Sequence, residues 1–384
     1  MILFIPSEKH INPMQKRNPT KSVRVGSVFI GDNHPIVLQS MCATKTTDVE
    51  ATAKMANSLS QCGAGIVRIA VDTQKDADAL RQIRDLTDAN LSVDLQENYR
   101  LAESVAPFID KIRYNPGHLH HAEPEISWKD KVRKLAEIAD RFDCALRIGV
   151  NCGSVDKNVS QRDFKLTFSA LEHAEFLDSI GFVRYCVSIK GSNPLDVLVE
   201  NRHFAAQRPD IPLHLGVTEA GMPPEGVLKS RLALEPLLAE GIGDTIRVSL
   251  TVANDRKHEE IEAGRLILEN VKNGTVISPD AWNPNRLNIV SCPSCARVQN
   301  ESFVLLAEKV REATQFAADR PLKIAVMGCR VNGPGETDDA DLGVWCGQTH
   351  VNLKRGKELV GAFSYDEIIP KLLDELNSII IHSQ

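Results

Sequence analysis

The stretch Ala145-Leu-Arg-Ile-Gly-Val-Asn151 decides the fold, because its side chains alternate between two kinds. One set is leucine, isoleucine and valine, which suit packing beneath helices. The other set is Arg147, Gly149 and Asn151. Alternate residues of a β-strand face the same way, so the second set lies on the opposite side of the strand from the first. The stretch predicts a strand with helices over one face and a polar interior along the other.

Similar runs rich in valine and isoleucine recur along the chain: Pro35–Met41, Ile66–Val71, Leu91–Gln96, Lys111–Gly117, Ala145–Asn151, Arg184–Lys190, Pro212–Glu219 and Thr245–Leu250. Each precedes a segment of helical spacing: Asp48–Cys62, Gln74–Thr87, Leu101–Phe108, Ser127–Phe142, Lys165–Ile180, Pro194–Gln207, Pro224–Glu240 and Lys257–Asn273. Eight such units within about 240 residues predict an α/β fold, the (β/α)8 TIM barrel. An open doubly wound sheet is the alternative, but no GxGxxG loop follows the first strand.

The pattern changes after Trp282. Short strands are predicted at Asn288–Ser291, Leu322–Met327, Asp341–Cys346 and His350–Leu353. Helices are predicted over Ser302–Ala318 and from the capping pair Ser364 and Glu367 to about Ile380. We therefore expect a flexible N-terminal extension over residues 1–20, a TIM-barrel substrate domain over 21–275, a linker, and a smaller α/β domain over 287–384.

The composition is that of a globular protein, with 42% hydrophobic and 25% charged residues. No apolar run is long enough for a transmembrane helix, and the N-terminus lacks the pattern of a signal peptide, so we expect a cytoplasmic protein. The net charge of −6 argues against bulk nucleic-acid binding. Nine cysteines at irregular spacing indicate reduced thiols, some of them available for a metal.

The predicted strands carry an unusual number of cations on their polar faces: Arg68, Arg113, Arg147, Lys190 and Arg247. Asn115, Asn151, Ser188 and Ser249 share those faces. Buried cations need anionic partners, and the two carboxylates at strand ends, Asp94 and Glu219, are too few to neutralise five. Internal ion pairs are one explanation. A phosphorylated ligand at the C-terminal mouth of the barrel is the other, and we favour it because arginine binds two phosphate oxygens at once.

Three cysteines near the end of the chain form a candidate metal site. Cys292-Pro-Ser-Cys295 follows a predicted strand, and Cys329 follows the next, within Met327-Gly-Cys-Arg-Val-Asn-Gly-Pro-Gly-Glu336. Three thiolates can hold an iron–sulfur cluster or a zinc ion, and a carboxylate can supply the fourth ligand. No second CxxC and no nearby histidine completes a usual zinc set. His118, His120 and His121 follow the fourth strand but lack the i, i+4 spacing of helical metal ligands.

At these motifs the chain resembles the bacterial 4-hydroxy-3-methylbut-2-enyl diphosphate synthase family, iron–sulfur enzymes of the non-mevalonate isoprenoid pathway. The resemblance covers residues from about 20 to 350 and is carried by motifs in a fixed order. They include Gln39-Ser-Met41, Ile66-Val-Arg68, Arg113-Tyr-Asn-Pro-Gly117, Arg147-Ile-Gly-Val-Asn151, Val187-Ser-Ile-Lys190, Thr218-Glu-Ala-Gly221, Ser291-Cys-Pro-Ser-Cys295 and Gly328-Cys-Arg-Val-Asn-Gly-Pro-Gly-Glu336.

The resemblance implies an oxidoreductase that converts 2-C-methyl-D-erythritol 2,4-cyclodiphosphate to (E)-4-hydroxy-3-methylbut-2-enyl diphosphate. Ring opening and loss of water would consume two electrons from flavodoxin or ferredoxin. It also implies a homodimer in which the cluster domain of one subunit closes over the barrel of the other. The implied cofactor is a 4Fe–4S cluster held by Cys292, Cys295, Cys329 and Glu336.

The chemistry of this reaction gives the residues at the barrel mouth expected roles. Glu219 is the candidate proton donor for the departing hydroxyl, and Asp94 and Asn151 are expected to orient substrate hydroxyls. The expected substrate-binding residues are Arg68, Arg113, Asn115, Arg147, Asn151, Lys190, Arg247 and Ser249. Two positions depart from the family pattern. Gln96 stands where relatives tend to have histidine, and Arg330 stands where they often have valine. Glutamine can hydrogen-bond but cannot transfer a proton near neutral pH.

Overall fold

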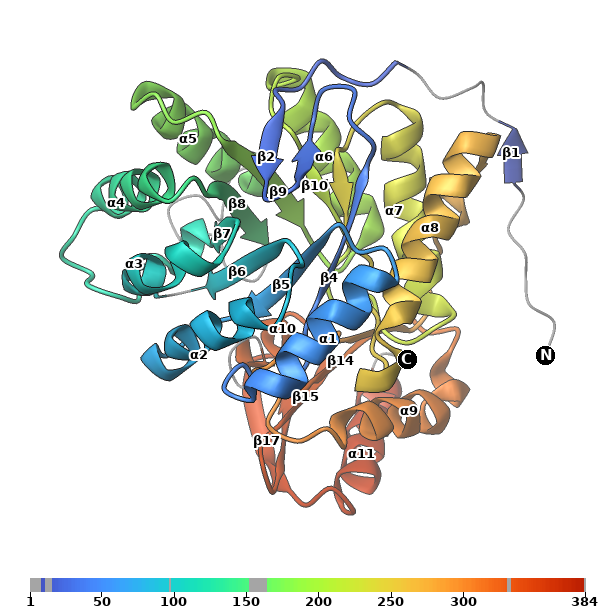
Figure 1. Ribbon diagram of the computed structural model, residues 1–384. Coiled ribbons are helices and arrows are strands. Elements are labelled where there is room, and N and C mark those ends of the chain that lie inside the picture. The colour runs from blue at the N-terminus through green and yellow to red at the C-terminus, as the bar shows by residue number, and fades with distance from the viewer. Residues whose placement is uncertain (1–7, 11–15, 97, 152–163, 330–332, 383–384) are drawn as a thin grey trace.

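The computed structural model describes residues 8–10, 16–96, 98–151, 164–329 and 333–382. Two large sheets organise these ranges (Figure 1). The C-terminal sheet and its helices, coloured orange to red, lie below the barrel in this view. Within the described ranges, no helix combines the length and apolar character that crossing a membrane requires.

The first sheet is the predicted TIM barrel. Its strands are all parallel, in the order β10-β11-β4-β5-β6-β7-β8-β9. A parallel bridge between Val187 and Leu213 joins the two ends of this order. The strands are β4 (Val37–Met41), β5 (Ile66–Ala70), β6 (Leu91–Gln96), β7 (Lys111–Tyr114), β8 (Ala145–Asn151), β9 (Tyr185–Lys190), β10 (His214–Leu215) and β11 (Thr245–Ile246).

Helices follow the strands at positions that local capping residues mark. The Thr73 side chain accepts from Asp76 N while the Asp76 side chain accepts from Thr73 N, which starts the second helix. Asn193 caps another helix whose first residue is Pro194. The barrel helices are α1 (Val49–Gln61), α2 (Gln74–Asp85), α3 (Ala102–Val105), α4 (Trp128–Arg141), α5 (Lys165–Ser179), α6 (Pro194–Gln207), α7 (Glu225–Ala239) and α8 (His258–Asn273).

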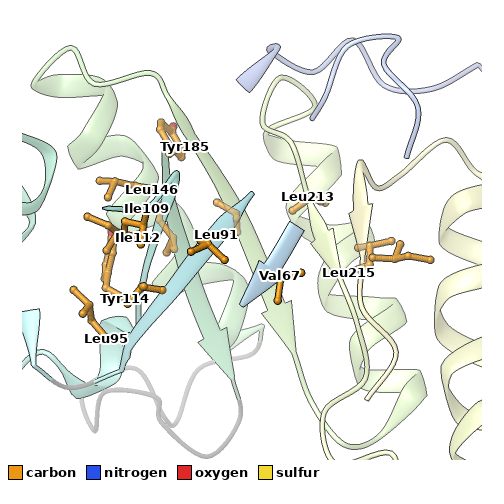
Figure 2. Close-up of a cluster of buried hydrophobic side chains, with 14 of the residues drawn as sticks. Val67, Leu91, Leu95, Ile109, Ile112, Tyr114, Leu146, Tyr185, Leu213 and Leu215 are labelled. Carbon is orange, nitrogen blue, oxygen red and sulfur yellow. The ribbon is translucent and has the colours of Figure 1, made fainter. Parts of the chain in front are cut away.

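The alternation predicted for the strands places their apolar side chains in one continuous core between strands and helices. Figure 2 shows members of this core from several neighbouring strands, among them Val67, Leu91, Ile112 and Leu146. Each of these four side chains is fully buried. The opposite faces of the same strands carry the cations, so the packing of the helices directs those cations toward the barrel axis.

A small hairpin closes the N-terminal end of the barrel. Its strands are β2 (Val23–Val25) and β3 (Val28–Ile30). Val23, Val25 and Ile30 pack with Ile66, Ala145 and Cys186, which lie at the starts of barrel strands. Apolar side chains therefore fill this end, and the polar interior opens only toward the other end.

The second sheet has the order β13-β14-β15-β16-β17. The first three strands are parallel, and the last two are antiparallel to their neighbours. They are β13 (Asn288–Ser291), β14 (Lys323–Met327), β15 (Leu342–Cys346), β16 (Val351–Arg355) and β17 (Glu358–Phe363). The helices are α9 (Phe303–Ala313), α10 (Gly333–Asp338) and α11 (Ile368–His382). Cys292 and Cys329 follow β13 and β14, whose carboxyl ends lie side by side.

Several elements differ from prediction. The edge strand β17 was not predicted, because Glu358, Leu359 and Val360 at its start are all exposed and give no alternation. The segment predicted as one helix over 101–108 is a short α-helix between two 3-10 turns. Within the expected flexible extension, Glu8–His10 form strand β1, which pairs with β12 (Thr275–Ile277).

Candidate active site

The carboxyl ends of the barrel strands open into a cavity that the C-terminal module covers. The barrel wall consists of Met41, Arg68, Asp94, Gln96, Arg113, Arg147, Val150, Asn151, Ser188, Lys190, Thr218, Glu219, Arg247 and Ser249. The facing wall consists of Cys292, Pro293, Ser294, Cys295, Arg297, Val298, Met327, Gly328 and Cys329. A cationic surface and a surface of three thiols therefore face one another, and both come from one chain.

All the predicted substrate-binding residues line this cavity except Asn115. The Asn115 amide lies directly behind the wall, where its Nδ2 donates to Asn151 Oδ1 at 3.5 Å. The predicted catalytic residues Asp94 and Glu219 line the cavity as well. Glu336 is buried on α10 but is not part of the lining, and Arg330 lies outside the described residues.

The cations at the mouth repel one another. Burial lowers the pKa of Lys190 well below its usual value, and the charges of Arg147 and Arg247 lower it further. Arg147 is only 1% exposed, and within the described ranges its Nε and Nη1 have no hydrogen-bond partner. Nε and Nη2 of Arg247 also have no hydrogen-bond partner there, although Nη2 lies 3.9 Å from Glu260 Oε1. Buried donors without acceptors are costly, so this arrangement favours an anionic ligand with several oxygens.

Arg113 is the one cation in this group that several acceptors fix in place. Its Nη1 donates to Asp94 Oδ1 at 2.9 Å and also to Gln96 Oε1, and its Nη2 donates to Gly149 O at 2.9 Å. A Cβ at Gly149 would lie 2.2 Å from Arg113 Nε, so only glycine leaves room for the guanidinium there. Burial opposes ionisation of Asp94, but Arg113, Arg68 and Arg297 hold the pKa of this carboxyl well below its usual range.

Glu219 sits in a strained backbone conformation, with φ of +47°. The C-terminal module holds this backbone: Ser291 N donates to Glu219 O at 3.2 Å, and Ala220 and Ser291 form a parallel bridge. Burial raises the pKa of Glu219. Burial, followed by the charge of Glu219, also raises the pKa of Glu336. The two carboxyls are therefore close enough to disfavour simultaneous ionisation.

The three thiols lie on adjacent loops. Gly328 N donates to Cys292 Sγ at 3.2 Å, and Ser294 takes a left-handed φ of +65° in the turn between Cys292 and Cys295. Burial raises the pKa of Cys292 well above its usual value, and the nearby Cys329 and Cys295 thiols add to that effect. Among the described side chains, no three of the His, Cys, Asp and Glu type could hold a single metal ion together. The thiols share a cavity wall without meeting at one point.

Contacts from the barrel hold the cysteine loop in place, and the sequence did not reveal them. Arg297 Nη2 lies 2.6 Å from Asp72 Oδ1, and its Nη1 lies 3.3 Å from Asp94 Oδ2. Lys45 Nζ donates to the carbonyl oxygens on both sides of Arg297, those of Ala296 and Val298. The position of Arg297, two residues after Cys295, was the one available signal.

Further contacts hold the strand and turn that precede Cys295. Thr251 Oγ1 lies 2.6 Å from Ser291 Oγ and 2.9 Å from Cys292 O. Lys257 Nζ donates to Pro293 O at 2.7 Å and pairs with Glu260 at 2.6 Å. The backbone of the cysteine turn is therefore fixed against the barrel by buried side chains on either side.

Comparisons with known proteins show what the chain is similar to. Residues 20–265 match the GcpE TIM-barrel domain, and residues 288–378 match the GcpE protein C-terminal domain. A 4-hydroxy-3-methylbut-2-en-1-yl diphosphate synthase (flavodoxin) from Rhodopirellula baltica is 58% identical over 375 residues, which cover 96% of this chain and 98% of the relative. A protein of the same name from Nautilia profundicola is 36% identical, covering 94% and 99%. Dihydropteroate synthase from Yersinia pestis superimposes with a TM-score of 0.47 at 13% identity, covering 65% of this chain and 98% of that structure.

Proposed function

Because the chain belongs to the GcpE family, we propose that it acts as a 4-hydroxy-3-methylbut-2-en-1-yl diphosphate synthase of isoprenoid biosynthesis. It converts 2-C-methyl-D-erythritol 2,4-cyclodiphosphate to the linear allylic diphosphate. Two electrons and a proton enter, a ring C–O bond breaks and a water molecule leaves. The observation that carries this proposal is the single cavity with a cationic wall and a thiol wall.

The cationic wall binds the cyclic diphosphate. Arg147 and Arg247 offer buried N–H groups with no acceptor within the described part of the chain, and Lys190 adds a third charge. Phosphate oxygens satisfy such donors and offset the repulsion between the cations. Asn151 and Ser249 supply neutral hydrogen bonds beside them, and Arg68, Arg113 and Asn115 complete the set. The arrangement binds the diphosphate and places the carbon skeleton toward the thiols.

Cys292, Cys295, Cys329 and Glu336 would hold a 4Fe–4S cluster. The fit rests on the thiol wall, where three cysteines on adjacent loops line one cavity. A four-iron cluster would take thiolate ligands from such a set, and its positive charge would favour the thiolate of Cys292, whose pKa is raised by burial and then by the neighbouring Cys329. When bound, the cluster supplies electrons and a Lewis-acidic iron to the cavity. As a carboxylate among thiolates, Glu336 would be the weakest of the four ligands and would leave its iron the most accessible to substrate.

The carboxyl groups at the barrel mouth carry the acid–base chemistry. Glu219 is buried, and burial raises its pKa, which favours the protonated form that a proton donor to the departing hydroxyl needs. Its Oε2 has no hydrogen-bond partner within the described residues. Asp94 stays ionised beside Arg113 and accepts hydrogen bonds from substrate hydroxyls.

Flavodoxin is the proposed electron donor, since the relatives carry that word in their names; ferredoxin is the alternative. We also propose a homodimer, as the sequence resemblance implies. The resemblance places the cluster domain of one subunit over the barrel of the other, whereas in the described residues both walls of the cavity come from one chain.

Anaerobically purified protein tests this function. We expect the reduced holoenzyme to convert the cyclic diphosphate to the allylic diphosphate, with about four irons per chain. Product can be followed by phosphorus NMR, and iron by a colorimetric assay. A colourless protein with one tightly bound zinc, or no turnover with any low-potential reductant, would refute the assignment.

The contact of Arg297 with the barrel gives a separate prediction. Removing this side chain by Arg297→Ala frees the cysteine loop from Asp72 and Asp94. We expect kcat to fall about a hundredfold because small displacements of reacting groups are costly. Iron content should stay at the wild-type level, since Arg297 holds the loop and is not a ligand.

Arg286→Ala is the matched control, because Arg286 is an exposed arginine near the same module whose partner Asp319 is 93% exposed. Its kcat should equal that of the wild type. If Arg297→Ala also kept the wild-type kcat, the contacts with Asp72 and Asp94 would have no part in the reaction.

A further inference from the structure

Gln96 ends β6 in a conformation that its surroundings must hold. Its φ is +47°, and the pairing of β6 with β7 shifts register between Asp94 and Gln96. Residues other than glycine rarely adopt this left-handed region, and they keep it where neighbouring groups fix them. The side chain is buried and forms part of the cavity wall. Neighbouring groups must therefore hold Gln96 in this conformation.

The partners of Gln96 decide which of its side-chain atoms donates and which accepts. Arg113 can only donate, so the Gln96 oxygen, Oε1, faces Arg113 Nη1. The amide nitrogen Nε2 must then donate, and its partner at 3.1 Å is Nδ1 of His118. A ring nitrogen that accepts from an amide carries no proton. His118 is therefore neutral with its proton on Nε2, at the end of a chain from Arg113 through Gln96 to His118.

The surroundings of His118 keep the imidazole neutral. Burial lowers the pKa of His118 to about 3, and the charges of Arg113, His121 and His120 act in the same direction against Asp94. The ring stacks on His121 at 5.0 Å, and His121 meets His120 at 4.2 Å. Protonation of Nδ1 would also turn the Gln96 amide away from Arg113, so geometry and electrostatics agree.

The hydrogen bonds that Arg113 donates decide which of its N–H groups remain available at the cavity. Asp94 and Gln96 take both hydrogens of Nη1, and Gly149 O takes one from Nη2. Arg113 Nε is buried and, within the described ranges, has no hydrogen-bond partner. No hydrogen of Nη1 is left for a ligand. The N–H of Nε and the second hydrogen of Nη2 are the groups left for an anion.

We propose that Gln96 and His118 are positioning residues that aim Arg113 at the substrate through an uncharged hydrogen-bond chain. This inference rests on the proposed function, which places Arg113 in the diphosphate site. It gives the glutamine at position 96 a use: its amide accepts from Arg113 and donates to His118, and it carries no charge of its own.

A matched pair of variants at position 118 tests the proposal on the holoenzyme. In His118→Asn the side-chain oxygen occupies the place of Nδ1 and still accepts from Gln96. In His118→Leu the branch remains but the acceptor is lost, leaving a buried N–H unsatisfied. We expect KM for the cyclic diphosphate to rise about tenfold in His118→Leu and to stay near the wild-type value in His118→Asn, with kcat little changed in both.

A spectroscopic readout separates positioning from general damage. Nitrogen-15 histidine NMR of the holoenzyme, assigned by the signal missing from His118→Asn, should show an unprotonated Nδ1 from about pH 5.5 to 8.

Equal KM values for the two His118 variants, or a protonated His118 at pH 6, would overturn the proposal. Arg113→Ala distinguishes this failure from failure of the proposed site. If Arg113→Ala bound the cyclic diphosphate as tightly as the wild type, the proposed diphosphate site and this inference would both fall. If Arg113→Ala bound weakly while the His118 variants behaved alike, only the inference would fall.

Discussion

Cys329→Ser is expected to lose most of its iron and, with it, the conversion of the cyclic diphosphate. Cys329 follows β14, beside the loop that carries Cys292, and its thiol lies in the wall that faces the cations. Serine is nearly the same size but is a poor ligand for iron at neutral pH. Changes to groups that only orient metal ligands already cost about 10- to 100-fold, so losing a ligand should cost at least about a hundredfold in activity.

The measurement is iron and sulfide content per chain after anaerobic purification, with the visible spectrum and turnover on the same samples. Cys62→Ser is the control. Cys62 is a half-buried free cysteine at the end of α1 and is not part of the cavity wall. It should keep the iron, the colour and the rate. A Cys329→Ser protein with unchanged iron and turnover would remove Cys329 from the proposed ligand set.

Strand alternation was enough to predict the cationic wall. Arg147 in β8 and Lys190 in β9 lie at positions opposite to the apolar residues of the same strands. Once those apolar residues pack under helices, the cations have only the barrel axis to occupy. Eight strand–helix units predict a closed barrel, which brings the carboxyl ends of its strands and the polar residues there to one mouth. This part of the site follows from a period of two residues, which is a local property of the sequence.

The contacts that join the two modules could not be predicted in this way. Asp72 and Arg297 are 225 positions apart, and Lys45 and Ala296 are 251 apart. No local pattern encodes such pairs, because they depend on how one module docks on the other. The bond between Gln96 and His118 spans only 22 positions, yet it depends on a left-handed residue at a strand end, which propensity does not indicate.

The edge strand β17 illustrates a different limit. Its first three residues are exposed, and Leu359 is 62% exposed. Inside–outside alternation arises where one face of a strand is buried, and this strand begins without such a face. Its pairing with β16 is held by backbone hydrogen bonds and includes a register shift between Leu353 and Lys354. Sequence patterns therefore predicted the strands that position the site and missed this edge strand.

Arg147→Met should weaken substrate binding strongly while leaving the ligand-free protein as stable as the wild type, or more so. The methionine keeps most of the volume of Arg147 but removes a charge whose Nε and Nη1 have no acceptor within the described ranges. Burial and the charge of Arg113 lower the pKa of Arg147 to about 10, so the folded protein disfavours this cation. Substituting a buried charge by an apolar side chain of similar size is often neutral or stabilising.

Binding should respond in the opposite way, because charge-assisted hydrogen bonds to phosphate are each worth about 1.5–3 kcal/mol. Losing two of them predicts a rise in KM of about a hundredfold or more.

Arg184→Met is the control: Arg184 precedes β9 at the closed end of the barrel and pairs with Asp140 at 3.0 Å. It should lose a little stability and keep its KM. Thermal unfolding of the two ligand-free variants tests the expected stabilities, and steady-state kinetics test the expected KM values. An Arg147→Met protein that unfolds more easily but binds substrate normally would make Arg147 a structural residue, and the anion site would then have to rest on the other four cations.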